Sequence, residues 1–201
     1  MPTSFAVTWD YRCPFARNIH DHLVTALEAG APWDVQFMAF SLDQPHVAEG
    51  EPSVFERPEE FPGLLANEAG IVVRERMPER FLAAHRALFD ARHDEGADLR
   101  RREVVTEVLE AAGVDASEVL AEVDSGWPRE TFRKEHFAAV DGHDVFGVPT
   151  FILGERATFV RLMNRADHGN PEGSISTITR ILELLEGWPE LNELKETRIP
   201  R

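Results

Sequence analysis

The sequence predicts an α/β protein in which two strand-containing segments flank a block of helices. Three observations predict this class: short apolar or alternating runs near both ends, helical periodicity between them, and a strand–helix–strand order at the start. The chain has 201 residues, of which 43% are hydrophobic and 28% charged, so it is long enough for one good-sized domain or a compact domain with an insertion.

The first segment is predicted to form a strand, a helix and a second strand. Residues 4–9 are a short apolar run typical of a buried strand. From Pro14 the apolar residues recur at helical spacing until Gly30, and proline suits the first helical position because no amide hydrogen is needed there. Residues 33–40 alternate, which predicts a strand. A helical connection between consecutive strands favours a parallel pair.

The middle of the chain is predicted to be a loop followed by helices. Residues 42–62 are rich in Pro, Glu and Ser, which is typical of a loop. Pro78 and Pro128 suit helix starts, and Asp115 can cap a helix. Apolar stripes predict five helical segments, over residues 65–73, 78–89, 104–112, 115–123 and 128–140.

The strand pattern returns near the end of the chain. Residues 149–153 and 157–163 are joined by a short turn containing Gly154, which predicts a β-hairpin. Asn170 and Pro171 then begin a last helix, whose apolar stripe ends at Gly187.

Composition argues against several classes of function. The net charge of -15 repels phosphate backbones, so we expect no nucleic-acid partner. No run of about 18 apolar residues is present, so we expect no membrane span. The start of the sequence lacks a basic segment followed by an apolar one, and a single cysteine excludes an internal disulfide. A cytoplasmic, reducing location therefore fits best.

Cys13 is the main candidate for chemistry. It lies at a strand-to-helix turn, where free amide hydrogens and the helix dipole would stabilise a thiolate and lower the pKa of the thiol. Arg12 and Arg17 would strengthen this effect if their side chains turned inward, and Asp10 would oppose it. The alternative is that Cys13 is a small buried hydrophobic residue without reactivity.

Other motifs give no competing site. The eight histidines show no zinc-ligand spacing, and there is no second cysteine, so we expect no metal. No glycine-rich phosphate-binding motif is present, which leaves nucleotide binding unsupported.

Two motifs resemble the DsbA-like thioredoxin family. They are Cys13-Pro14-Phe15-Ala16 and the Phe-Gly-Val-Pro-Thr-Phe run at residues 146–151. The family includes 2-hydroxychromene-2-carboxylate isomerases, kappa-class glutathione transferases and FrnE-type proteins. The resemblance implies a thioredoxin-like fold with an inserted all-helical domain. Residues 1–60 and 143–190 would form the thioredoxin-like domain, and residues 61–142 the insertion.

The resemblance also implies a function and a set of site residues. Cys13 would be the catalytic thiol of a thiol-disulfide oxidoreductase. In the family the proline matching Pro149 is cis, and the backbone of the residue before it, here Val148, pairs with the bound thiol or peptide. The substrate-binding residues would be Pro14, Phe15, Ala16, Val148 and Pro149. Phe15 is either an apolar wall for the substrate or simply a core residue.

The sequence departs from the dithiol members at Ala16, where they have a second cysteine. No resolving thiol can then release a mixed disulfide. Two alternatives follow: a thiol-dependent transferase or isomerase, or a non-catalytic binding module. The transferases and isomerases commonly have Ser at the cysteine position, so Cys13 favours redox chemistry.

The expected partners are small molecules. We expect no bound cofactor, with glutathione or mycothiol as a possible co-substrate and a small-molecule thiol or disulfide as substrate. Because relatives are often dimeric, a homodimer is also possible.

Overall fold

A computed structural model describes residues 3–195 of the chain. The predicted strand–helix–strand start is confirmed as β1 (Thr3–Trp9), α1 (Pro14–Glu28) and β2 (Trp33–Ala39). The two strands are parallel, as the helical connection predicts, and they pair from Thr3 with Trp33 through Trp9 with Ala39. The buried positions of β1 begin at Phe5, so this strand lies inside the fold.

The end of the chain completes the sheet with β3 (Thr150–Leu153) and β4 (Arg156–Phe159), which form the predicted antiparallel hairpin. Because β3 also pairs antiparallel with β1, the sheet order is β2-β1-β3-β4. The second strand of the hairpin stops at Phe159, which corrects the prediction that it continues to residue 163. Helix α7 (Pro171–Gly187) follows, and the Asn170 side chain caps it by accepting from the Gly173 amide.

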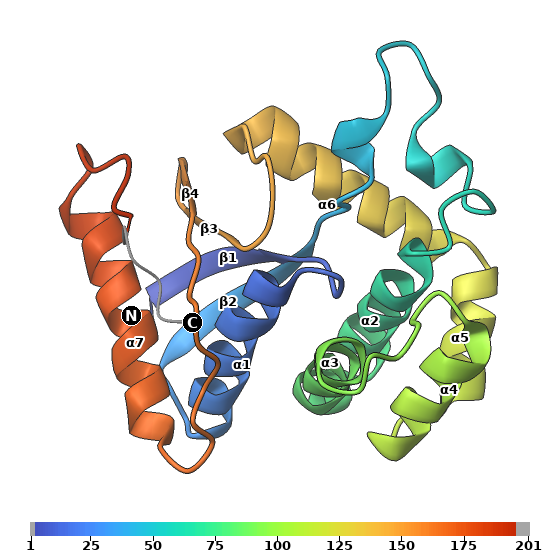
Figure 1. Cartoon of the computed structure of the whole chain (residues 1–201), viewed down its shortest axis with the longest axis horizontal. Coiled ribbons are helices and arrows are strands. Elements are labelled where there is room, and N and C mark those ends of the chain that lie inside the picture. The colour runs from blue at the N-terminus through green and yellow to red at the C-terminus, as the bar shows by residue number, and fades with distance from the viewer. Residues whose placement is uncertain (1–2, 196–201) are drawn as a thin grey trace.

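The predicted loop after β2 contains two short 3-10 turns, η1 (Gln44–His46) and η2 (Val54–Glu56). Five α-helices follow: α2 (Leu64–Arg76), α3 (Pro78–His93), α4 (Arg102–Ala111), α5 (Ala116–Asp124) and α6 (Trp127–His143). Asp115 caps α5 as predicted, since its side chain accepts from the amides of Ser117 and Glu118. Figure 1 shows α2 to α5 beside the sheet, on the side away from α7. The domain boundaries at residues 60 and 142 stay our proposal.

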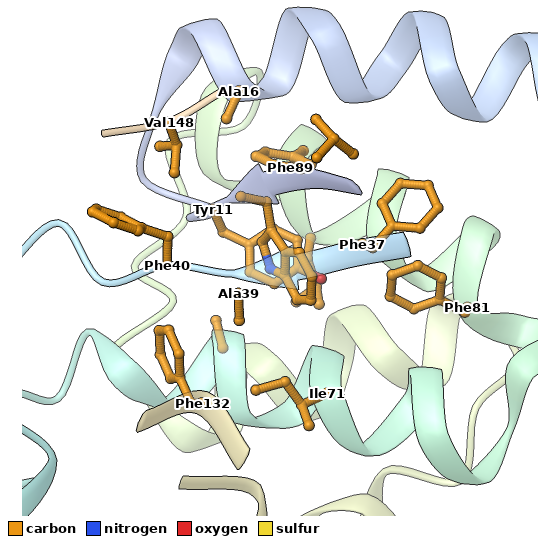
Figure 2. Close-up of a cluster of buried hydrophobic side chains, with 14 of the residues drawn as sticks. Tyr11, Ala16, Phe37, Ala39, Phe40, Ile71, Phe81, Phe89, Phe132 and Val148 are labelled. Carbon is orange, nitrogen blue, oxygen red and sulfur yellow. The ribbon is translucent and has the colours of Figure 1, made fainter. Parts of the chain in front are cut away.

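One hydrophobic core joins the sheet to the helices. It contains the fully buried Trp9 of β1 together with residues of α2 to α6. Phe37 of β2 and Phe81 of α3 pack with ring centroids 5.1 Å apart, and Figure 2 shows these two side chains within the cluster. Ala16 and Val148 lie at one border of the same cluster (Figure 2), where β1 ends and α1 begins. The core therefore extends to the position of Cys13.

Within residues 3–195, no helix combines the length and the apolar character that crossing a membrane requires.

Candidate thiol site

Cys13 is the N-cap residue of α1. Its backbone is extended, with φ −90° and ψ 118°, and its carbonyl accepts the first helical hydrogen bond from the Arg17 amide at 3.0 Å. Its Sγ accepts from the Ala16 amide at 3.4 Å. Pro14 begins the helix, where its missing amide hydrogen leaves no bond unmade. The predicted place of Cys13 at the start of the first helix is thus confirmed.

The loop before β3 lies against this sulfur. The Val148–Pro149 peptide bond is cis, as the resemblance implies, and Cys13 Sγ lies 3.3 Å from the Val148 carbonyl oxygen, to which the thiol donates. Thr150 fixes the loop, because its amide donates to Thr8 Oγ1 at 2.9 Å and its hydroxyl donates to the Gly147 carbonyl at 2.8 Å. The structure therefore brings together Cys13 and Val148, which are far apart in sequence.

The pKa of the Cys13 thiol is raised, which contradicts the prediction of a lowered value. The residue is only 8% exposed, and burial disfavours the charged thiolate. Hydrogen bonds from the Ala16 and Phe15 amides lower the pKa, but burial outweighs them, and the Asp10 charge raises it further. The bond from the thiol to the Val148 carbonyl also needs the proton. The resting site holds a protonated thiol.

The two arginines expected to help the thiolate are engaged elsewhere. Arg12 pairs with Asp10 at 2.7 Å and with Asp43 at 2.8 Å. Arg17 pairs with Asp94 at 2.7 Å. Neither guanidinium turns toward the sulfur, so neither arginine stabilises a thiolate at Cys13.

Arg161 is the basic residue beside the thiol, and our sequence reasoning missed it. It follows β4, and its guanidinium carbon lies 4.7 Å from the centroid of the Phe15 ring. Its charge opposes the rise in the pKa of Cys13. The only signal in the sequence was its place directly after the hairpin that begins next to Pro149.

The predicted substrate-binding residues differ in exposure. Ala16, Val148 and Pro149 are buried, whereas Pro14 is exposed and Phe15 is half-buried against the core. Accessible apolar surface near the thiol therefore comes from Pro14 and Phe15. Phe146, two residues before Val148, is 73% exposed, and its ring centroid lies 5.4 Å from that of Phe159. In the sequence, Phe146 is distinguished only as the first residue of the motif at residues 146–151.

Cys13 is the only cysteine in the sequence, so the site has a single thiol. A single sulfur can form a mixed disulfide with another molecule, but no internal one. Among residues 3–195, no three His, Cys, Asp or Glu side chains gather as metal ligands would. A cavity of about 520 Å³ lies between η2 and α6, lined in part by Phe55, Arg129 and Phe137, and includes none of the predicted site residues.

The chain was compared with protein-family models, curated protein sequences and solved structures. A family model described as a DSBA-like thioredoxin domain matches residues 7–167, which is most of the chain. A search of curated protein sequences gave no match.

Solved structures share the fold at low sequence identity. A probable DsbA oxidoreductase from Streptomyces coelicolor is 17% identical, with a TM-score of 0.60 over 96% of this chain and 93% of the other. The cytosolic disulfide reductase DsbM from Pseudomonas aeruginosa, solved with GSH, is 18% identical, with a TM-score of 0.59 over 90% of this chain and 100% of the other. A 2-hydroxychromene-2-carboxylate isomerase is 16% identical, with a TM-score of 0.60 over 92% and 98%. Because the family model covers most of the chain, the chain belongs to the DsbA-like thioredoxin-domain family.

Proposed function

We propose that the protein is a thiol-disulfide oxidoreductase that works through Cys13 alone. One observation carries the proposal: the Cys13 sulfur caps α1 and lies 3.3 Å from the carbonyl of Val148, next to Pro149. A second sulfur bound at this carbonyl edge would lie beside the nucleophile. The exposed Pro14 and the half-buried Phe15 would contact the rest of the substrate.

The proposed reaction has two exchange steps. The Cys13 thiolate attacks a small disulfide, forms a mixed disulfide with one half and expels the other half as a thiolate, which takes up a proton. Because Ala16 supplies no resolving thiol, a second small thiol then attacks the mixed disulfide, loses its proton and regenerates Cys13. The net change is a thiol–disulfide exchange: the incoming thiol ends in a new disulfide with the half that was bound to Cys13, and the other half of the original disulfide leaves as a thiol. Glutathione and mycothiol are the candidate thiols, and the similar DsbM structure was solved with GSH.

The test is turnover of a mixed disulfide between glutathione and a reporter thiol, with glutathione as reductant. We expect catalysis above the uncatalysed rate, and we expect Cys13→Ser to abolish it because the reaction passes through the sulfur. The same assay with mycothiol identifies the preferred thiol. Turnover that survives in Cys13→Ser would contradict the proposal.

A second candidate is a thiol-dependent transferase or isomerase, and the raised pKa of Cys13 favours it. A protonated thiol can donate a hydrogen bond to the sulfur of a bound thiol and so stabilise that molecule as a thiolate, without reacting itself. The hydroxyl of Cys13→Ser would keep this donor. Conjugation or isomerisation that needs added thiol and survives in part in Cys13→Ser would favour this candidate. Activity in neither assay would leave a non-catalytic binding role.

We also propose where the protein works and what it binds. A cytoplasmic location fits a lone thiol that works with small thiols. A small-molecule thiol or disulfide is the expected partner, and a homodimer is a proposal that solution molecular-weight measurements test.

A further inference from the structure

Arg161 stands over two aromatic rings beside the thiol. Its guanidinium carbon lies 4.7 Å from the Phe15 ring centroid and 5.9 Å from that of Phe159. Phe15 is the second residue of α1 and lies two positions after Cys13. Stacking on aromatic faces restricts where a guanidinium can move while leaving its N–H groups free to donate.

Arg161 has no acidic partner within residues 3–195. Its side chain is exposed and forms no hydrogen bond or ion pair in that part of the chain. Three other arginines of the fold behave differently: Arg12, Arg17 and Arg165 are each paired with at least one carboxylate. A guanidinium offers five donors suited to a carboxylate. At Arg161 these donors remain available to a bound molecule.

The loop that carries Arg161 is held against α1 and α3. Asn18 of α1 donates from Nδ2 to the Leu162 carbonyl at 2.9 Å. Arg165 pairs with Asp21 of α1 at 3.1 Å and with Asp90 of α3 at 2.7 Å. Asp21 is buried, so this anchor is partly shielded from water. The backbone on the far side of Arg161 is therefore fixed before any ligand arrives, which lowers the entropy lost on binding.

The charge of Arg161 favours an anionic ligand at this site. The chain has a net charge of -15, which repels anionic molecules from most of its surface. The unpaired guanidinium over the Phe15 ring opposes that repulsion locally. Its field reaches the sulfur, because Arg161 is among the groups that lower the pKa of Cys13.

We infer that Arg161 recognises a carboxylate on the small thiol or disulfide that reacts at Cys13. The substrate class is then an anionic aliphatic thiol or its disulfide, with its chain lying across Phe15. This inference rests on the proposed function, since it assigns the substrate class of the same site. It also separates the two candidate co-substrates, because glutathione carries carboxylates and mycothiol carries none.

The experiment compares three small disulfides of similar length and different charge. Dithiodipropionate is anionic, hydroxyethyl disulfide is neutral and cystamine is cationic. The rate of adduct formation on Cys13 is followed by mass spectrometry at low salt with the full chain. Each rate is divided by the rate for a free model thiol, which removes the intrinsic reactivity of the probe. The measured quantity is the anionic-to-neutral ratio of these corrected rates.

Arg161→Gln should lower this ratio by roughly two- to fivefold, the size expected for one partly exposed ion pair. Arg161→Glu should shift the preference to cystamine, and added salt should weaken the wild-type preference. Arg180→Gln is the matched control, since Arg180 is exposed on α7 and the substitution removes the same charge. We expect it to leave the ratio unchanged.

Two results would overturn this inference and leave the proposed function standing. In the first, Arg161→Gln does not change the anionic-to-neutral ratio. In the second, Arg180→Gln lowers that ratio as much as Arg161→Gln does. The first would mean that Arg161 does not meet the substrate, and the second that only overall charge matters. Failure of all three probes to modify Cys13 in the wild type is a different result. It would overturn the proposed exchange function and this inference with it.

Discussion

Arg74 and Glu135 take the place of a neighbouring strand along the outer edge of β2. Their side chains pair at 2.5 Å, Arg74 donates to the Phe37 carbonyl at 2.5 Å, and the Ala39 amide donates to Glu135 at 2.6 Å. β2 is one of the two edge strands of the sheet, so these backbone groups have no strand partner on that side. An ion pair from α2 and α6 satisfies them and ties the helices to the sheet.

Glu135→Ala should therefore destabilise the fold more than an ordinary surface substitution. It leaves the Ala39 amide without its partner and Arg74 without its counter-charge, and both side chains of the pair are only 15% exposed. We expect a loss of about 2 kcal/mol in the free energy of unfolding, measured by urea denaturation. Glu135→Gln should lose less, because its amide oxygen can still accept from Ala39. Glu130→Ala, which removes an exposed pair with Arg133, should have little effect. Equal losses for both alanine variants would contradict this role.

Three buried side chains form a hydrogen-bonded chain between α1, α3 and the end of β1. The Thr8 carbonyl lies 3.1 Å from His20 Nε2, which must therefore donate. His20 Nδ1 then accepts from His85 Nε2 at 2.9 Å, and His85 Nδ1 accepts from the Tyr11 hydroxyl at 2.8 Å. This order of donors requires both histidines to be neutral.

Stability should fall as the pH drops below about 6.5, where a histidine in the unfolded chain takes up a proton. Burial lowers the pKa of His20 to about 4 and that of His85 well below its usual value. The unfolded state thus binds more protons than the folded state between about pH 6.5 and 4, so the stabilisation present at neutral pH is lost across that window. With its pKa at about 4, His20 contributes about 2 kcal/mol to the difference in unfolding free energy between pH 7 and pH 5, and His85 adds to it in the same direction.

Urea denaturation at pH 7 and pH 5 measures this difference. His85→Gln should reduce it, because one buried proton acceptor is gone. His46→Gln, at an exposed position, should leave it as in the wild type. The same pH dependence in His85→Gln as in the wild type would argue against the buried pair as its cause.

Gly70 is required by the close approach of α2 to Tyr11. A Cβ built at Gly70 would overlap the Tyr11 hydroxyl, which donates to His85. Gly70→Ala should destabilise the protein by about 1–3 kcal/mol, despite the better helix propensity of alanine. Gly142→Ala in α6 is the control, since no atom lies within 4 Å of the added Cβ, and it should be neutral or slightly stabilising. Thermal unfolding of the two variants decides the matter, and a Gly70→Ala protein as stable as the wild type would refute the close contact.

Ala16→Cys should create a dithiol centre. Ala16 lies one helical turn after Cys13, and its amide already donates to the Cys13 sulfur. We expect the variant to form an internal disulfide on oxidation and to reduce a model disulfide without a second small thiol. Ala111→Cys adds a thiol at an exposed position on α4 and should gain neither property. Thiol titration before and after oxidation reports the outcome, and two free thiols in oxidised Ala16→Cys would show that the loop cannot support the exchange.

The sequence predicted the fold well because its signals are local. Pro14 and Gly30 bracket α1, Asp115 caps α5, and Asn170 caps α7. Where the prediction of β4 was too long, the cause is tertiary: Asn18 on α1 holds the Leu162 carbonyl, so the chain leaves the sheet after Phe159.

The candidate site was predictable in position but not in electrostatics. The helix N-terminus that favours a thiolate is visible in the sequence around Cys13, whereas the burial that outweighs it arises when Val148 packs against the sulfur. The partners of Arg12 and the position of Arg161 over Phe15 also depend on distant segments. No local pattern encodes such contacts.

Formation of a mixed disulfide at Cys13, followed against pH, tests the central claim most directly. The native protein is incubated with a small disulfide from pH 7 to pH 10, and the adduct is quantified by mass spectrometry. Because burial raises the pKa of Cys13 above the free value of about 8.5, we predict one adduct on Cys13 and a rate that is still rising with pH above about 8.5, where the rate of a free thiol levels off. No adduct on the native protein at any pH, with rapid labelling of the urea-unfolded chain, would contradict the account.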